Sequence, residues 1–362
     1  MTLVAAFLAF IVTALFMFVL RPVADAMGLV DLPGGRKRHG IPVPVIGGIC
    51  MSIGLGFGAA LVEHPTVWTP ILLAVYLLIV VGTIDDRFDL PPNVRLIAQT
   101  CAALLVTFGS NVVVTSLGSP LFFDVHLGIF AHPFTVVFIV TLINAFNVID
   151  GIDGLAGGLA LLSLTALAVI GVTTSVFPLV IILLAVVCGF LLFNFPFGFG
   201  RAVRTFMGDA GSTFLGLSIA TVGIQLSQGA SPRIAPVVGL WLVAVPVFDL
   251  FSAIARRVVQ GKSLFAPDHE HLHHVLTEQG LSRRRTLVWM LLLAALCASI
   301  GVMGDFLAVP DGVMMVLWLV AGVVYYQMLR NPKFVAACAR RIAGPRQPTN
   351  ARPPSDSANQ ES

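Results

Sequence analysis

Hydrophobic residues run along this chain in long blocks, and short polar segments separate them. Blocks of about 17 to 25 residues are long enough to cross a bilayer as helices. We place eleven at 2–20, 45–62, 67–84, 94–110, 134–150, 155–173, 177–195, 211–228, 234–254, 286–304 and 311–329. The pattern therefore predicts an all-α polytopic integral membrane protein with about eleven transmembrane helices.

Composition supports this class. The 362 residues are 57% hydrophobic and 11% charged, whereas soluble domains carry about 25% charged residues. No basic residue precedes the first block and no small-residue cleavage site follows it, so we expect a retained helix there. The five cysteines are scattered and indicate neither disulfides nor a zinc site.

Basic residues predict the orientation. All but one of the 21 Lys and Arg residues fall in one alternating set of loops, and only Arg233 falls in the other. Because positive residues mark the cytoplasmic side, we expect a periplasmic N-terminus and a cytoplasmic C-terminus. Residues 1–330 would form one transmembrane domain whose polar loops bear the site, followed by a basic, disordered tail at 331–362. The net charge of +3 then reflects topology, and no nucleic acid is expected as a partner.

Carboxylates lie within or next to several of the apolar blocks. Charge at membrane depth is costly and by default suggests function. In a helix, Asn144, Asn147, Asp150 and Asp153 would recur every three residues on one face, which could hold a nucleotide or a metal ion.

The vicinal pair Asp85 and Asp86 ends another block. Negative charge at a helix C-terminus opposes the helix dipole, so we expect a cation to bind this pair. Carboxylate oxygens are ligands that suit Mg²⁺ or Mn²⁺. The alternative is a solvated helix end. Asp209, in Gly208–Ser212, is either a ligand or a helix cap, and the preceding Phe206 could stack on a base or anchor the chain at the membrane edge.

Four of the eight histidines lie within residues 269–274. In a loop flanked by basic residues, their imidazoles fit phosphate better than adventitious zinc, although a structural loop anchor is the plainer alternative. Acids, histidines and basic residues thus share one membrane face. That combination suits a polyanion handled with a divalent cation.

Four motifs occur in a characteristic order: Asp85–Asp89, Asn144–Gly154, Phe206–Ser212 and His271–His274. As a set they resemble the polyprenyl-phosphate N-acetylhexosamine-1-phosphate transferases, over about residues 28–285. The sister branch that transfers phospho-MurNAc-pentapeptide usually has a lysine where Asp89 stands, and a histidine triplet. The sequence therefore looks closest to the bacterial branch that transfers GlcNAc-1-phosphate to undecaprenyl phosphate, which begins O-antigen and related surface polysaccharides.

This resemblance implies a reaction in which a UDP-N-acetylhexosamine and undecaprenyl phosphate give undecaprenyl-diphospho-sugar and UMP, with Mg²⁺ or Mn²⁺. It implies that Asp85 and Asp86 are catalytic and that Asp209 binds the metal. It places uracil on Phe206, the nucleotide beside Asp150 and Asp153, and the phosphates beside His271, His273 and His274. Asn144, Asn147, Asn194, Lys37 and Arg38 complete the expected substrate-binding set.

Several alternatives stay open. The donor could be UDP-GlcNAc, UDP-GalNAc, UDP-FucNAc or UDP-MurNAc-pentapeptide. A phosphate monoester has a second pKa of about 6 and is mostly dianionic at neutral pH, so direct attack is favoured over a covalent aspartyl-phosphate. An ion-coupled transporter or a membrane scaffold explains the one-sided loops less well. We expect a multi-pass protein of the bacterial inner membrane with a cytoplasmic active site, and a second copy of the chain is a candidate partner.

Overall fold

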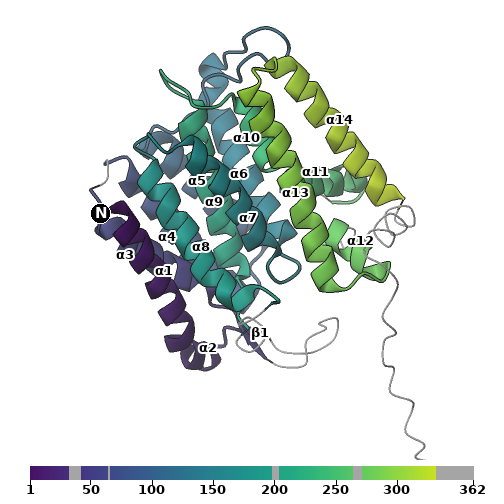
Figure 1. The fold of residues 1–362 in the computed structure, drawn as a ribbon. Coiled ribbons are helices and arrows are strands. Elements are labelled where there is room, and N and C mark those ends of the chain that lie inside the picture. Colours follow the sequence, from purple (N-terminus) through teal and green to yellow (C-terminus); the bar gives the residue numbers. More distant parts are fainter. Residues whose placement is uncertain (32–41, 64–65, 198–203, 264–270, 332–362) are drawn as a thin grey trace, which may run out of the picture.

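The computed structural model is a bundle of helices (Figure 1) and describes residues 1–31, 42–63, 66–197, 204–263 and 271–331. In chain order the helices are α1 (Thr2–Val19), α2 (Arg21–Met27), α3 (Gly47–Ala60), α4 (Trp68–Phe88), α5 (Pro92–Leu104), η1 (Leu105–Gly109), η2 (Gly128–Phe130), α6 (Ala131–Ile149), α7 (Leu155–Ile170), α8 (Phe177–Asn194), α9 (Gly208–Ser227), α10 (Pro236–Leu242), α11 (Ala244–Val259), α12 (Leu272–Glu278), α13 (Arg283–Phe306) and α14 (Asp311–Arg330). The strands β1 (Val30–Asp31) and β2 (Val43–Pro44) pair antiparallel.

The helical, polytopic class is confirmed. Among the described residues, seven helices are long and apolar enough to cross a membrane, namely α1, α4, α6 with η2, α8, α9, α13 and α14. The pair α10 and α11, bent by 81°, makes an eighth if it counts as one span, while α3 and α7 are apolar but shorter. The number eleven therefore stays a prediction, as do the orientation of the termini and the tail at 331–362, of which only Asn331 is described.

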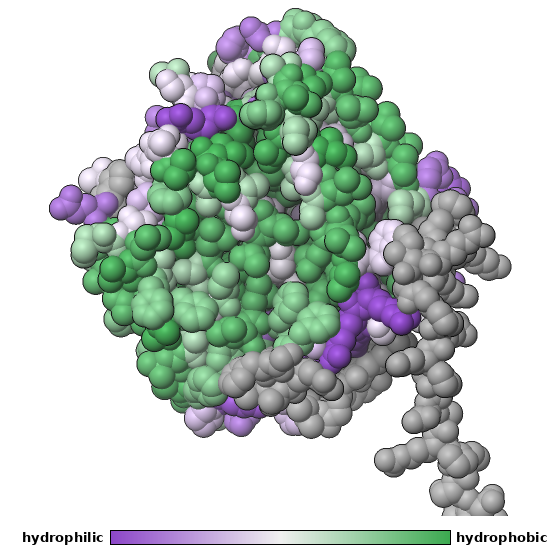
Figure 2. Space-filling view, viewed as in Figure 1, coloured by the Kyte–Doolittle hydropathy of each residue, from purple (hydrophilic) through white to green (hydrophobic). Residues whose placement is uncertain are grey.

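The outer surface suits a bilayer. On the face shown in Figure 2, apolar residues cover the middle of the bundle and hydrophilic residues gather toward its ends. The outermost helices expose large apolar side chains, such as Phe7 of α1 and Val320 and Val323 of α14. An apolar surface of this extent would promote association in water, whereas lipid tails are as apolar as these side chains.

Helix α9 is the most enclosed of the spanning helices, and α3, α4, α6 and α7 contact it. Gly82 of α4 faces its first turn, where a methyl group in place of the glycine hydrogen would overlap the backbone of Ala210. The missing side chain therefore lets α4 approach α9 closely. This approach brings the acidic end of α4 to the start of α9.

The two ends of α9 contact different loops. The end of α4 and the beginning of α9 meet at Asp86 and Asp209. At the other end of α9, the Gln228 side chain accepts the backbone N–H groups of Thr115 and Ser116. A helix of 20 residues is about 30 Å long, so Asp86 and the segment with Thr115 and Ser116 lie at opposite ends of α9.

Candidate active site

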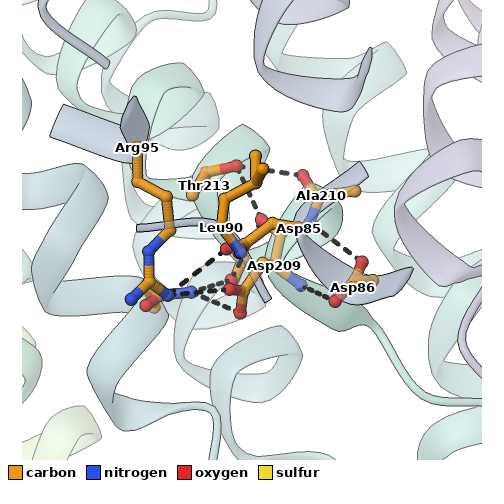
Figure 3. A network of polar contacts seen from close by, with 9 residues as sticks. Asp85, Asp86, Leu90, Arg95, Asp209, Ala210 and Thr213 are labelled. Atoms are coloured by element: carbon orange, nitrogen blue, oxygen red, sulfur yellow. Dashed lines mark hydrogen bonds and ion pairs between the residues drawn. The ribbon is translucent and has the colours of Figure 1, made fainter. Parts of the chain in front are cut away.

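Asp86 closes the first turn of α9. Its carboxylate accepts the backbone N–H of Asp209 at 2.8 Å and that of Ala210 at 3.4 Å (Figure 3). The first N–H groups of a helix have no partner within the helix, and they carry the positive end of its dipole. Gly208, with φ +74°, makes the turn that aims them at Asp86. The second acid of the pair is therefore a cap in trans, from one helix to another.

Asp85 points to a different partner. Its Oδ1 accepts the backbone N–H of Leu90 at 2.7 Å, and its Oδ2 lies 3.3 Å from a guanidinium nitrogen of Arg95. The same nitrogen lies 3.4 Å from Oδ2 of Asp209, so Asp209 sits between Arg95 and Asp86 in Figure 3. Neighbouring residues on a helix point about 100° apart, which explains why the adjacent acids differ in their contacts.

Asp209 is also held from α6. The Asn147 side-chain amide donates to Oδ1 of Asp209 at 2.8 Å and to the Ser212 hydroxyl at 3.1 Å. Asp209 is thus fixed by groups from α4, α5 and α6. The position of its carboxylate is therefore set by the protein itself.

The expectation of one helical face through 144–154 holds only for its first half. Helix α6 ends at Ile149, and Asp150 to Gly154 form a turn before α7. Asn144 binds Gln99 of α5 at 2.7 Å. The helix stops because glycine follows each aspartate, and Gly154 adopts φ +80°.

Asn194 supports this turn from behind. Its side-chain oxygen accepts the N–H of Gly154 at 2.7 Å, and its amide donates to the carbonyl of Thr205 at 2.9 Å. The residue is buried, and it borders the polar cavity described next. It therefore ties the 150–154 turn to the segment that leads into Phe206.

Two cavities meet at Asn147 and Asp209. One has a volume of about 660 Å³ and a polar wall. The other, about 750 Å³, is a largely apolar groove between α4, α5, α6 and α11. Polar residues of the first are Asp31, Asp86, Asn147, Asp150, Asp153, Asn194, Arg204, Asp209 and Arg283. Polar residues of the second include Asp85, Arg95, Gln99, Asn144, Asn147, Asp209 and Arg257.

Phe206 belongs to the polar cavity. The guanidinium of Arg204 lies 4.9 Å from the centre of its ring, and Arg204 also forms an ion pair with Asp153. The backbone of Phe206 donates to Pro44 at 2.8 Å and accepts from Gly47 at 3.0 Å. The ring is thus mounted on the segment around β2, and a cation is available beside it.

The three histidines occupy different environments. His271 is tied to Asp249 at 2.7 Å, His273 is 1% exposed, and His274 is partly exposed. Burial and the neighbouring His274 lower the pKa of His273 to about 3, so its ring is neutral at physiological pH. None of them is among the described residues that line the two cavities.

Carboxylate chemistry at the junction fits a divalent cation. Across the described part of the chain, no three His, Cys, Asp or Glu side chains are grouped to hold a metal ion by themselves. Mg²⁺ commonly uses only one or two carboxylates together with substrate phosphates. Asp85 and Asp209, which both approach one cationic nitrogen of Arg95, are a donor set of that kind.

The site predicted from the sequence lacked four arginines of the two cavities, Arg95, Arg204, Arg257 and Arg283, as well as Asp31 and Gln99. Arg95 carried a usable signal, because it is the only charged residue within the apolar block 94–110. The predicted residues Lys37 and Arg38 lie outside the described residues.

Asp150 makes the stability of the folded protein depend on pH. Burial raises its pKa from the ordinary value of 3.8 to about 8, and the carboxylates of Asp209, Asp153 and Asp86 add to the shift. The folded protein therefore binds more protons here than the unfolded chain between about pH 4 and pH 8, and its stability falls as the pH rises through that range. Without divalent cations, we expect the melting temperature to fall more steeply from pH 6 to pH 9 in the unmodified protein than in Asp150→Asn.

Asp124→Asn, which removes an exposed acid, serves as the control and should keep the original slope. Parallel melting profiles for the unmodified protein and Asp150→Asn would contradict the assignment.

Known proteins resemble this chain along most of its length. Residues 68–227 match the model of glycosyl transferase family 4. The undecaprenyl-phosphate alpha-N-acetylglucosaminyl 1-phosphate transferase of Escherichia coli (strain K12) is 35% identical over 343 residues, covering 92% of each chain. The protein of the same name from Pasteurella multocida is 34% identical over 347 residues, covering 94% of this chain and 96% of that one. With this identity along nearly its whole length, the chain belongs to glycosyl transferase family 4.

Proposed function

We propose that this protein transfers GlcNAc-1-phosphate from UDP-GlcNAc to undecaprenyl phosphate, giving undecaprenyl-diphospho-GlcNAc and UMP. The names of the relatives support the transferred group, N-acetylglucosaminyl 1-phosphate, and the acceptor, undecaprenyl phosphate. The observation that carries the proposal is the meeting of a polar cavity and an apolar groove at Asn147 and Asp209. A water-soluble nucleotide sugar and a lipid phosphate need two such compartments with one junction. We place the reaction at the first membrane step of a surface polysaccharide such as O-antigen.

The polar cavity suits the donor. Phe206 offers a ring on which uracil can stack, with Asp150 and Asp153 on the same wall. Arg204 and Arg283 supply the charge that a diphosphate requires, since guanidinium groups bind phosphate oxygens in pairs. A bound base would either displace Arg204 from the face of the Phe206 ring or stack between that ring and the Arg204 guanidinium.

The apolar groove suits the acceptor. Leu96, Val136 and Val140 are among the side chains along it, and Arg95 and Arg257 give its wall positive charge. A polyprenyl chain would lie against the apolar part, and its phosphate would reach Arg95. The lipid phosphate then lies beside Asp85 and next to the junction at Asp209.

We favour direct attack. An oxygen of the lipid phosphate attacks the sugar-linked phosphorus, a new P–O bond forms, and the bond from that phosphorus to the UMP oxygen breaks, so UMP leaves. The lipid phosphate is largely dianionic at neutral pH and needs little help from a base. Asp85 would orient it through Arg95, while Asp86 holds the first turn of α9 and has both oxygens occupied. These engaged oxygens make an aspartyl-phosphate on Asp86 the weaker alternative.

A divalent cation, Mg²⁺ or Mn²⁺, would neutralise the charge of the diphosphate when bound. Asp209 and Asp85 are the residues that would hold it. Asn147 would keep the Asp209 carboxylate aimed at the junction through its hydrogen bond.

The activity can be measured as transfer of label from UDP-[¹⁴C]GlcNAc into butanol-extractable lipid by the purified protein. We expect Asp209→Asn to lower kcat by a factor of about 100 or more, the usual loss when a group that stabilises the transition state is removed. Asp305→Asn, which changes an acid near the opposite end of the bundle, should retain activity. An inactive unmodified protein, or a panel of UDP-sugars in which UDP-GalNAc, UDP-FucNAc or UDP-MurNAc-pentapeptide is the better donor, would contradict the proposed donor.

We place the site on the cytoplasmic face of a bacterial inner membrane, because 20 of the 21 Lys and Arg residues belong to that set of loops. A fluorescent protein fused after the C-terminus should therefore fluoresce in cells, and alkaline phosphatase fused at Gly229 should be active. The reverse pattern would place the site on the outer face.

A further inference from the structure

A buried carboxylate lies behind the histidine motif. Asp249 of α11 is 0% exposed, and three groups surround its oxygens. Oδ1 accepts the Tyr325 hydroxyl at 2.8 Å and the backbone N–H of Leu272 at 3.0 Å, and Oδ2 lies 2.7 Å from Nδ1 of His271. A buried carboxylate is tolerated only when its hydrogen-bonding capacity is filled. Asp249 therefore joins three segments that are distant in sequence: α11, the start of α12, and α14.

This arrangement fixes the orientation of one imidazole. An ionised carboxylate only accepts hydrogen bonds, so Nδ1 of His271 carries the hydrogen toward Asp249. His271 occupies the position just before α12, in an extended conformation, and the N–H of Leu272 binds the same carboxylate. Side chain and backbone are therefore both held, and the direction in which α12 begins is set.

The segment that begins at His271 leads to the donor cavity. The ring of His273 lies parallel to that of His271, with centroids 5.9 Å apart. His273 packs directly on Gly151, where a methyl group would overlap the ring. Gly151, Asp150 and Asp153 line the polar cavity. His273 thus forms the back of the wall that faces the donor, and its own position follows from the start of α12.

We propose that Asp249 and Tyr325 are positioning residues, which hold the His271–His273 segment against the 150–154 turn and so shape the donor cavity without touching a substrate. The inference rests on the proposed function, because it assigns the nucleotide sugar to that cavity. It gives α14, which lies beyond the residues matched by the family model, a part in the active site. In Figure 1, α14 runs down the edge of the bundle and ends near α12.

Tyr325→Phe is the most selective test, since it removes one hydroxyl and leaves the ring. The centre of that ring lies 5.9 Å from the centre of the Phe248 ring. A hydrogen bond to a charged acceptor contributes enough to change an equilibrium constant by about tenfold. We expect the KM for UDP-GlcNAc to rise by about that factor, with the KM for undecaprenyl phosphate unchanged. Tyr326→Phe, the same change at the next residue, is the matched control and should leave both constants unchanged.

Asp249→Asn tests whether Tyr325 changes the donor KM through Asp249. If Tyr325 acts through Asp249, the double variant should have the donor KM of Asp249→Asn alone, because residues in one network are not additive. Independent effects would multiply instead and would overturn the proposed path. If Asp249→Asn fails to fold, Tyr325→Phe alone carries the test.

A purely structural role would show a different pattern in Tyr325→Phe. The melting temperature and the fraction of active protein would fall, while the donor KM of the remaining enzyme stayed normal. That result, or equal changes in both KM values, would overturn the inference. Failure of the proposed function is distinguishable, because the unmodified protein would then be inactive with UDP-GlcNAc.

Discussion

The capping of α9 by Asp86 is the contact on which the rest of the site depends. It places an anion from the end of α4 against the unpaired N–H groups and the positive dipole end of α9. Because Gly82 lets these helices approach, the contact is short, and Asp209 emerges beside it at a fixed angle. Once Asp209 is fixed, Asn147 and Arg95 can reach it from α6 and α5. The junction of the two cavities is therefore built by helix ends, whose unpaired backbone groups and water-facing positions can tolerate charge in a membrane protein.

The polar residues around that junction are divided between the two cavities. Asp85 and Arg95 border the apolar groove, whereas Asp86, Asp150 and Asp153 border the polar cavity. The vicinal pair is thus divided between the two compartments by the 100° turn of a helix. Behind the donor cavity, two buried residues support the 150–154 turn. Asn194 binds Gly154 and Thr205, and His273, near the start of α12, packs on Gly151. A turn made of aspartates and glycines has little rigidity of its own, and these buried neighbours supply it.

The sequence predicted what depends on composition and on local pattern. Polar residues within or next to the apolar blocks identified Asp85, Asp86, Asn147 and Asp209, and the structure brings these four together. The three-residue period from Asn144 to Asp153 was a poorer guide, because Gly151 and Gly154 end the helix before the second half of the pattern. Contacts between distant segments could not be read from spacing.

Asp249 and Tyr325, for example, are 76 residues apart, and Tyr325 resembles any aromatic residue of a spanning helix until its partner is known. Arg95 had a sequence signal, but its role depends on two acids, one of them 114 residues away. The histidines also show that the sequence does not reveal contacts between distant segments. Their clustering was obvious, whereas the division into an anchored, a buried and a partly exposed ring required the packing around α12.

The central claim is that donor and acceptor enter through separate compartments that meet at Asp209. Steady-state kinetics with both substrates varied tests it, on two variants that each alter one compartment. Val140→Trp fills the apolar groove, and Phe206→Ala removes the ring from the polar cavity. The account predicts that Val140→Trp raises the KM for undecaprenyl phosphate alone and that Phe206→Ala raises the KM for UDP-GlcNAc alone. If both variants raise the same KM, the two cavities do not divide the substrates and the account is wrong.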